Sequence, residues 1–289
     1  MTRAFTALVN PIAGGGRAAQ RWAPLAGRLA AAGAEVRVEV TRGRDHAIDL
    51  AREACEQGRI AVAVGGDGLV RDVAAGAVAG GGAMAIVPAG RGNDQARRLA
   101  LPTDDAGLAA VLLRGEPRPV DVIEAAGQIV PGNVYAGIDS VATGIINRSR
   151  RLPALLAYRI APIRAIARWR PAHYRLTLDG RTLEFAAHTV VVANSGAYGH
   201  GLTIVPPARL TDGLLHVLVV GAGPRRQVVQ FMAQARRGTH LARAEVSVHT
   251  AREVTIEADR PIPVGADGDD LGTVPVTARV REGALSLIY

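Results

Sequence analysis

The chain has 289 residues, 48% of them hydrophobic, which is enough for one large or two ordinary domains with sizeable cores. All 34 basic residues are arginines and the net charge is +8, so we expect an anionic partner such as a nucleotide or a membrane surface. Aromatic residues make up only 3%, which argues against nucleic acid as that partner, and the single cysteine excludes an intramolecular disulfide.

Strand and helix patterns alternate through the first 114 residues. Short apolar, β-branched runs predict strands at residues 5–9, 35–40, 60–64 and 83–87. Apolar residues at helical spacing predict helices at residues 17–32, 45–56, 69–79, 95–99 and 104–114. This alternation is typical of a doubly wound α/β domain with a parallel sheet.

Three of the predicted strands end in a glycine-rich loop that leads into a helix, at Asn10–Gly16, Gly65–Gly68 and Gly90–Asp94. In open α/β sheets, ligands bind at the carboxyl ends of the strands, and a helix that begins there favours an anion. These loops therefore predict a phosphate-binding crevice that contains Asp67. The alternative is an ordinary β–α turn in which Asp67 caps the helix. None of the loops fits the P-loop or the dinucleotide fingerprint.

The pattern changes at Gly115–Pro119, where two prolines mark a linker or an extended crossing. We place the domain boundary here, with a nucleotide-binding domain at residues 1–120 and a mainly β domain at residues 121–289. Short β-like runs follow at residues 120–124, 128–135, 175–178, 182–193, 214–220, 245–249, 254–257, 274–280 and 284–288. Frequent turns between short strands predict a sandwich or barrel.

A basic amphipathic segment at residues 140–170 interrupts these strands and is predicted to be helical. Its arginines alternate with leucines and isoleucines, a composition that can lie on an anionic membrane surface. The alternative is a core-facing helix with a solvated arginine face. The N-terminus lacks a signal-peptide layout and no apolar run reaches membrane-spanning length, so the protein is expected in the cytoplasm, with peripheral and reversible membrane association.

Three motifs carry a resemblance to a known family: Asn10-Pro11 with its glycines, Gly65-Gly66-Asp67-Gly68, and Gly92-Asn93-Asp94. In order and rough spacing they resemble the diacylglycerol kinase catalytic-domain family, which includes bacterial lipid kinases, sphingosine kinases and ceramide kinases. The resemblance implies that ATP and Mg²⁺ bind in a cleft between the two domains and that a lipid hydroxyl is phosphorylated. It also implies that the last strand returns to the first domain.

Carried over residue by residue, the resemblance implies a set of nucleotide contacts in the first domain. They are Asn10, Thr41, Gly65, Gly66, Asp67, Gly68, Asp72, Arg91, Gly92, Asn93 and Asp94. For Thr41, a turn or helix-cap role is an equally good interpretation.

Two later motifs extend the resemblance into the second domain. The loop around Asp212 resembles a Mg²⁺-binding loop, with the Asp212 carboxylate and the carbonyls of Arg209 and Leu214 as ligands. Asp267 and Asp269 would occupy the two acidic positions of the family's late motif, and one of them would act with Asp67 on the lipid hydroxyl. The alternatives are an ordinary Asp-Gly turn and an exposed acidic turn, respectively.

The chain departs from the family pattern at Leu69, Arg71-Asp72, Arg91 and Asp269. Leu69 and Arg91 stand where the family has threonine, and Asp269 stands where it has glutamate. Arg91 could replace a lost phosphate contact with a charge-assisted one, or it could block the pocket. The leading hypothesis is thus an ATP-dependent lipid kinase. The alternatives are a non-catalytic nucleotide or lipid sensor and an NAD kinase, and a homodimer stays open.

Overall fold

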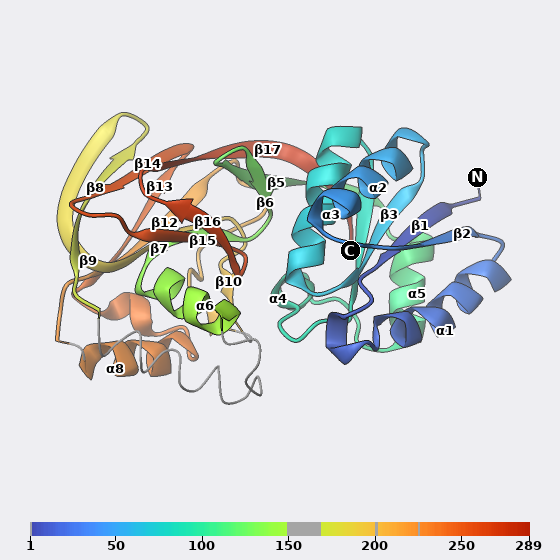
Figure 1. The fold of residues 1–289 in the computed structure, drawn as a ribbon, viewed down its shortest axis with the longest axis horizontal. Coiled ribbons are helices and arrows are strands. Elements are labelled where there is room, and N and C mark those ends of the chain that lie inside the picture. Colours follow the sequence, from blue (N-terminus) through green and yellow to red (C-terminus); the bar gives the residue numbers. More distant parts are fainter. Residues whose placement is uncertain (1, 149–168, 200–201, 225) are drawn as a thin grey trace. The chain divides into compact units, whose positions relative to one another are not determined.

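The computed structural model describes residues 2–148, 169–199, 202–224 and 226–289. The chain forms two compact units (Figure 1). The first contains the residues up to Val122 together with Glu282–Tyr289, and the second contains described residues within Ile123–Tyr198 and Leu202–Arg281. The chain is therefore an α/β unit followed by a β-rich unit, as the sequence predicts.

The first unit is built on a parallel sheet in the order β17-β4-β3-β1-β2. Its strands are β1 (Ala4–Val9), β2 (Glu35–Val40), β3 (Ile60–Gly65), β4 (Ala83–Pro88) and the end of β17 (Val276–Ile288). Its helices are a 3₁₀ turn η1 (Ala13–Gly15), α1 (Ala18–Ala31), α2 (Arg44–Glu56), α3 (Asp67–Gly80), α4 (Asp94–Arg98) and α5 (Asp105–Arg114).

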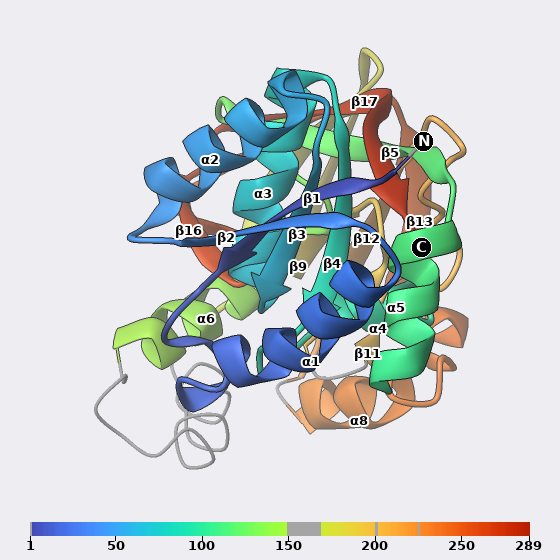
Figure 2. The same ribbon diagram turned by 90° about the vertical axis from the view of Figure 1, so that its right-hand side faces the viewer.

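Helices cover both faces of this sheet (Figure 2). Trp22, Leu25 and Leu29 of α1 join side chains of α5 in one core against β1, β3 and β4. Helices α2 and α3 contact each other and pack on strands β1 and β3. Both faces of the central strands are buried, which explains why β3 and β4 are continuous apolar runs rather than alternating ones.

The second unit is mainly antiparallel. Its strands are β5 (Pro117–Ala125), which begins in the first unit, β6 (Gln128–Val130), β7 (Asn133–Gly137), β8 (Ala172–Leu178), β9 (Arg181–Ala193), β10 (Ala197–Tyr198), β11 (Leu202–Thr203), β12 (Leu215–Gly221), β13 (Val246–Ala251), β14 (Glu253–Ala258), β15 (Pro263–Ala266), β16 (Asp269–Thr273) and the start of β17. Its helical elements are α6 (Ile138–Arg148), α8 (Arg226–Ala235) and the 3₁₀ turn η2 (His240–Ala242).

Strand β9 organises this unit because it serves two sets of neighbours. Its first half pairs with β8, and its second half pairs with β7 on one side and β12 on the other. The apolar side chains of these strands form one large core that includes Tyr174 and Trp169. The result is the sandwich-like sheet packing that frequent short strands predict.

Several elements differ from the sequence prediction. Strand β17 is continuous where two strands are predicted, because Gly283 adopts a φ of 58° and donates its N–H to Asp121 instead of ending the strand. Helix α8 lies where no helix is predicted. Helix α6 covers the start of the basic segment 140–170, and residues 149–168 of that segment lie outside the described residues. No helix that the structure describes is long and apolar enough to cross a bilayer.

Candidate functional site

The three glycine loops of the first unit touch one another. A Cβ on Gly90 would lie 2.3 Å from the Cα of Gly66, so only two glycines allow these backbones to meet. A Cβ on Gly14 would lie 2.5 Å from the carbonyl oxygen of Ala89, and Gly14 has a φ of 59°. Loops that follow β1, β3 and β4 therefore gather at the carboxyl ends of parallel strands, as the sequence predicts.

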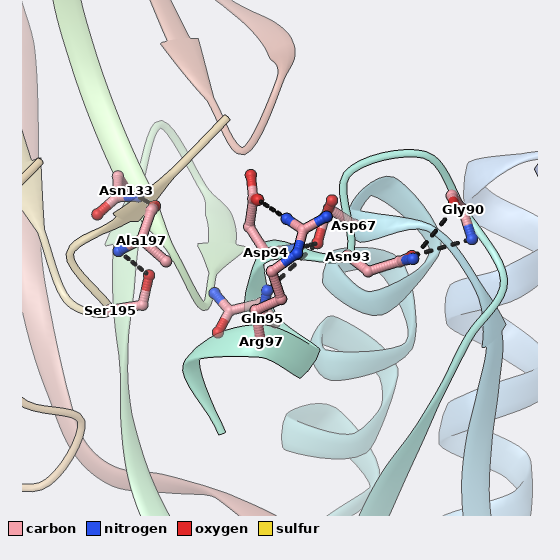
Figure 3. Close-up of polar contacts among 9 residues, drawn as sticks. All are labelled: Asp67, Gly90, Asn93, Asp94, Gln95, Arg97, Asn133, Ser195 and Ala197. Carbon is pink, nitrogen blue, oxygen red and sulfur yellow. Dashed lines mark hydrogen bonds and ion pairs between the residues drawn. The ribbon is translucent and has the colours of Figure 1, made fainter. Parts of the chain in front are cut away.

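Asp67 connects two of these loops (Figure 3). One carboxylate oxygen, Oδ1, accepts the N–H of Asp94 at 2.7 Å and the N–H of Gln95 at 3.4 Å. Asp67 thus satisfies the free N–H groups at the start of α4, although it is itself the first residue of α3. The alternative interpretation, in which Asp67 caps its own helix, is wrong, because its carboxylate caps the next helix.

The second oxygen of Asp67, Oδ2, lies against Gly92, where a Cβ would approach it to 2.5 Å. Burial raises the pKa of Asp67, and the nearby negative charge of Asp94 raises it further. Asp94 in turn forms an ion pair with Arg97, with an N–O distance of 2.8 Å (Figure 3). Two carboxylates thus stand close together at a helix N-terminus and beside glycine backbone.

Asn93 holds the shape of the loop. It adopts a φ of 54°, and its side chain accepts the N–H of Gly90 and donates to the Gly90 carbonyl (Figure 3). Both ends of the amide are therefore used within the loop, and the structure gives Asn93 a positioning role. A contact between Asn93 and a nucleotide stays a prediction.

The remaining nucleotide candidates of the first unit have varied surroundings. The Asn10 side chain accepts the N–H of Ile12, and the buried Thr41 hydroxyl contacts the Val9 carbonyl.

Asp72 forms ion pairs with Arg71 and Arg44. Gly65 ends β3 and Gly68 lies in the first turn of α3. Arg91 is exposed.

Two departures from the family pattern are accounted for by packing. Leu69 is 5% exposed, and its side chain lies against Gly65, so it fills the space between β3 and α3. Arg71 is 5% exposed and its guanidinium pairs with Asp72. Both side chains thus take structural positions in the first unit.

In the second unit, Asp267 and Gly268 form the turn of the β15–β16 hairpin. Their φ values of 45° and 90° are those of a type I′ turn, for which Asp-Gly is a preferred sequence. The Asp267 carboxylate accepts the N–H groups of Gly132 at 2.9 Å and Asn133 at 2.8 Å. Asp267 is therefore tied to the start of β7. Asp269 is the partly buried first residue of β16.

A polar cluster surrounds the start of β7. Buried Asn133 donates from its side chain to the Ala197 carbonyl and accepts the N–H of Gly196. Ser195 accepts the N–H of Ala197 (Figure 3). Asn133 thus links the loop after β9 to the turn that holds Asp267.

The predicted Mg²⁺ loop has its carboxylate engaged within the protein. Asp212 accepts the N–H of Leu214 with one oxygen and lies 2.9 Å from the Nε2 of His216 with the other. Arg209 is exposed. No group of three or more His, Cys, Asp or Glu side chains among the described residues could hold a metal ion. The described side chains therefore offer a single, already partnered carboxylate here, and the metal assignment stays a prediction.

The second unit also contains a small pocket, with a cavity volume of about 30 Å³, which the sequence did not reveal. Its lining is mainly apolar, with Asp139, His188, Thr189, Gln227 and Glu245 as polar members among Ile138, Val220, Gly221, Phe231 and Met232.

Asp139 is the titratable group of this pocket with the largest pKa shift. Burial raises its pKa to about 6, although the hydroxyl of Thr189 donates to it at 3.0 Å. The buried Nδ1 of His188 has no hydrogen-bond partner among the residues that the structure describes. A signal was present in the sequence, since Asp139 lies in the first turn of a helix that follows an apolar strand ending in glycine, and Asp67 also lies in the first turn of such a helix.

Comparisons with known proteins agree with this architecture. Residues 4–125 match the model of the diacylglycerol kinase catalytic domain, and residues 132–289 match that of the YegS C-terminal NAD kinase beta sandwich-like domain. A diacylglycerol kinase of Mycobacterium tuberculosis is 33% identical over 160 residues, which are 54% of this chain and 51% of the relative. One from Staphylococcus carnosus is 23% identical over 54% of this chain and 57% of its own. The aligned region thus spans about half the length of these relatives.

Solved structures are similar over almost the whole chain. A chain from Bacillus anthracis matches with a TM-score of 0.82 and 23% identity, covering 99% of this chain and 96% of its own. A second one from that organism, described as a diacylglycerol kinase, matches with a TM-score of 0.72 and 21% identity over 99% and 96%. At this identity the likeness establishes the fold alone.

Proposed function

Because the chain belongs to the diacylglycerol kinase catalytic-domain family, we propose that it transfers the γ-phosphate of ATP to the hydroxyl of a lipid, diacylglycerol-like or sphingoid-like. The single observation that carries this proposal is the contact between the loops after β1, β3 and β4, with Asp67 among them. Phosphoryl transfer depends mainly on positioning and on neutralising phosphate charge. Backbone N–H groups at the starts of several loops and helices can position the phosphates and offset part of their charge.

ATP is proposed to bind in the first unit at residues 10–16, 65–72 and 90–94. The backbone N–H groups of these loops would hold the phosphates, and exposed Arg91 would add a charge-assisted contact. The side chains of Asn93 and Asp67 keep the loops in place for this task.

The donor chemistry around Asp67 fits a divalent cation that arrives with the nucleotide. Asp67 and Asp94 are close enough for their charges to repel, which a cation would relieve. Mg²⁺ prefers oxygen ligands and is usually held by one or two carboxylates together with substrate phosphates. When bound, it would neutralise phosphate charge. The partnered carboxylate of Asp212 is a poorer candidate for this role.

Asp67 is also our candidate for receiving the hydroxyl proton. A carboxylate whose pKa is raised by burial is a stronger base than an exposed one. Its Oδ1 is held by two N–H groups, so the group that would take the proton is fixed in position. Roles for Asp267 and Asp269 in catalysis stay predictions, and for Asp267 the structure shows a clear structural role as well.

The test is transfer of label from γ-labelled ATP into extracted lipid, with Mg²⁺ present and a panel of lipids that carry free hydroxyls. We expect label in at least one lipid class, and Asp67→Asn should lower the transfer at least ~100-fold. Asp104→Asn is the matched control, because Asp104 also caps a helix with its carboxylate, at the start of α5, and should leave transfer unchanged. Nucleotide binding without transfer to any lipid would instead favour the sensor hypothesis.

A further inference from the structure

Strand β2 is the outermost strand of the first unit's sheet and has β1 as its one strand neighbour among the described residues (Figure 2). Its apolar side chains are also unusually exposed to solvent. Val38 is 51% exposed and Val40 is 54% exposed, although both belong to a strand of a parallel sheet. An exposed edge strand of this kind is a template for pairing with another strand.

One side of the β2 backbone faces away from β1, and the residues whose N–H and C=O groups lie on that side can be identified. The N–H groups of Glu35 and Thr41 donate to Arg3 and Val9, which flank or end β1. Successive residues in a strand point their backbone groups to opposite sides, so those of residues 36, 38 and 40 face away from β1. The residues with outward backbone groups are thus the three valines of the strand.

The side chains of β2 alternate between two faces. The valines at 36, 38 and 40 share the face on which α1 packs, and Val36 belongs to the margin of that core. The charged residues Glu35, Arg37 and Glu39 share the other face. A partner strand would therefore meet apolar side chains on one face and charges on the other.

We propose that two copies of this chain associate through β2, antiparallel, with Val38 opposite Val38 of the second copy. In this register Val36 lies opposite Val40, and both kinds of valine pair exchange hydrogen bonds through their outward backbone groups. Arg37 then lies opposite Glu39, and Glu39 opposite Arg37. The strand is thus complementary to itself in both hydrogen bonding and charge.

Neighbouring registers lack this complementarity. Centring the pair on Arg37 places two arginines opposite each other and sets Glu35 against Glu39. Centring it on Glu39 places two glutamates opposite each other. A shift by a single residue would bring apolar and charged faces together. Centring the pair on Val36 also sets Glu35 against Arg37, but it pairs only residues 35–37 of the strand. Charge and the length of the paired segment together select the register centred on Val38.

Helix α1 favours the same arrangement. Arg21 reaches the α5 side, where it contacts Thr103 and Asp105, and Trp22 and Leu25 face the sheet. Helical geometry then places Ala19, Ala23, Ala26 and Ala30 on the flank toward β2, and three of these four are exposed. In the proposed pair, a two-fold axis perpendicular to the sheet brings the two alanine flanks together above the exposed valines. Small side chains allow that approach.

Cysteine cross-linking in the full chain tests the register. Val38→Cys should form a disulfide-linked dimer on mild oxidation, since directly opposite residues have Cα atoms about 5.5 Å apart, within the range of a disulfide. Glu39→Cys alone should not, because its copies lie diagonally. An equimolar mixture of Arg37→Cys and Glu39→Cys should cross-link, and Arg37→Cys alone should not. The native Cys55 is buried and is shared by all samples.

Sedimentation of the same chain tests the association itself. Arg37→Glu or Glu39→Arg should raise the dimer dissociation constant at least ~10-fold by facing like charges, and the double exchange should restore it. Val38→Pro should give a folded monomer, because it removes an N–H that points away from β1. A parent chain that stays monomeric at high micromolar concentration overturns the proposal. So does a dimer that cross-links through Glu39→Cys alone or ignores the charge exchange.

Discussion

At the scale of single residues, the Asp67 carboxylate has both a structural role and a proposed chemical role. Its Oδ1 accepts two N–H groups at the start of α4, and its Oδ2 lies beside Gly92. An asparagine can keep the first contact, because asparagine caps helices about as well as aspartate, but it lacks the charge. Structural and chemical roles of the same side chain can therefore be separated by one substitution.

We predict that Asp67→Asn leaves thermal stability nearly unchanged and lowers lipid phosphorylation at least ~100-fold, the low end for losing a general base. Asp67→Ala should lower stability as well, by about 1 kcal/mol, because the N–H groups of Asp94 and Gln95 lose their acceptor. Thermal melting and labelled-lipid assays measure the two effects. Parental activity in a folded Asp67→Asn protein would leave Asp67 as a helix cap alone.

Asp139 makes stability depend on pH. Burial raises its pKa from 3.8 to about 6 in the folded protein, so between these values the folded protein binds a proton that the unfolded chain does not. This contribution increases stability as the pH falls from 6 to 4 and opposes folding above 6. Partial exposure of the residue to the pocket limits the effect.

Asp139→Asn removes this titration. At pH 7 the variant should be more stable than the parent by about 1–2 kcal/mol, and the difference should vanish near pH 4. The amide of the variant would retain an oxygen acceptor for Thr189, so packing is preserved. Urea unfolding of both proteins between pH 4 and 7 checks the prediction, and parallel stability curves would contradict it.

The sequence predicts only one part of the candidate site, namely the glycine loops that follow the strands. The positions of Gly65, Gly66 and Gly92 follow from apolar strands that end in glycine. The hydrogen-bond partners of Asp67 could not be predicted from the sequence, because Asp94 and Gln95 are far from Asp67 in the chain. The same holds for Asp267 and Asn133, which depend on the pairing of β15 with β7.

At the scale of elements, the loop between β4 and α4 is fixed by its close packing. Gly92 leaves room for the Asp67 carboxylate, and Gly90 leaves room for Gly66. The α4 helix that follows has only five residues, too few to be stable alone, so its start depends on these contacts. The loop and the helix therefore act as one piece.

We predict that Gly92→Ala destabilises the protein by about 1–3 kcal/mol, because the added Cβ displaces the Asp67 carboxylate. Gly27→Ala is the matched control. Its Cβ would meet nothing within 4 Å, and alanine favours the interior of α1. Urea unfolding should show a loss for Gly92→Ala and no loss for Gly27→Ala. Equal effects would refute the role given to the close contact.

Element prediction succeeded where local patterns and tertiary structure agree. The α/β alternation of the first unit is visible because β3 and β4 are buried on both faces and are bounded by glycine. Strands β15 and β16 were missed because their hairpin turn and the first two residues of β16 carry three carboxylates, which gives this stretch the composition of a polar loop. Helix α8 was missed although its amphipathic pattern is present.

At the scale of the whole molecule, the net charge of +8 supports a proposed peripheral contact with anionic membranes. We predict that co-sedimentation with vesicles rises with the fraction of anionic lipid and falls with salt, because surface charge attraction is screened. Replacing Arg150 and Arg151 by glutamine should weaken binding by about 1 kcal/mol per arginine. The control replaces exposed Arg175 and Arg181, which changes the net charge equally.

The two pairs of substitutions distinguish an effect of the basic segment from a general effect of charge. Equal weakening by both pairs would indicate that net charge alone matters. Binding to neutral vesicles that ignores salt would contradict the electrostatic proposal altogether.

The path of β17 also has a consequence for synthesis on the ribosome. Leu285, Leu287 and Ile288 are buried in the first unit, where residues 286–288 pair with β4. They are translated after every strand of the second unit, so β4 has an unpaired edge while more than half of the chain is being made. An open edge of this kind attracts other strands. The first unit can therefore complete its sheet only when translation has passed the second, and until then its open edge is prone to non-native pairing.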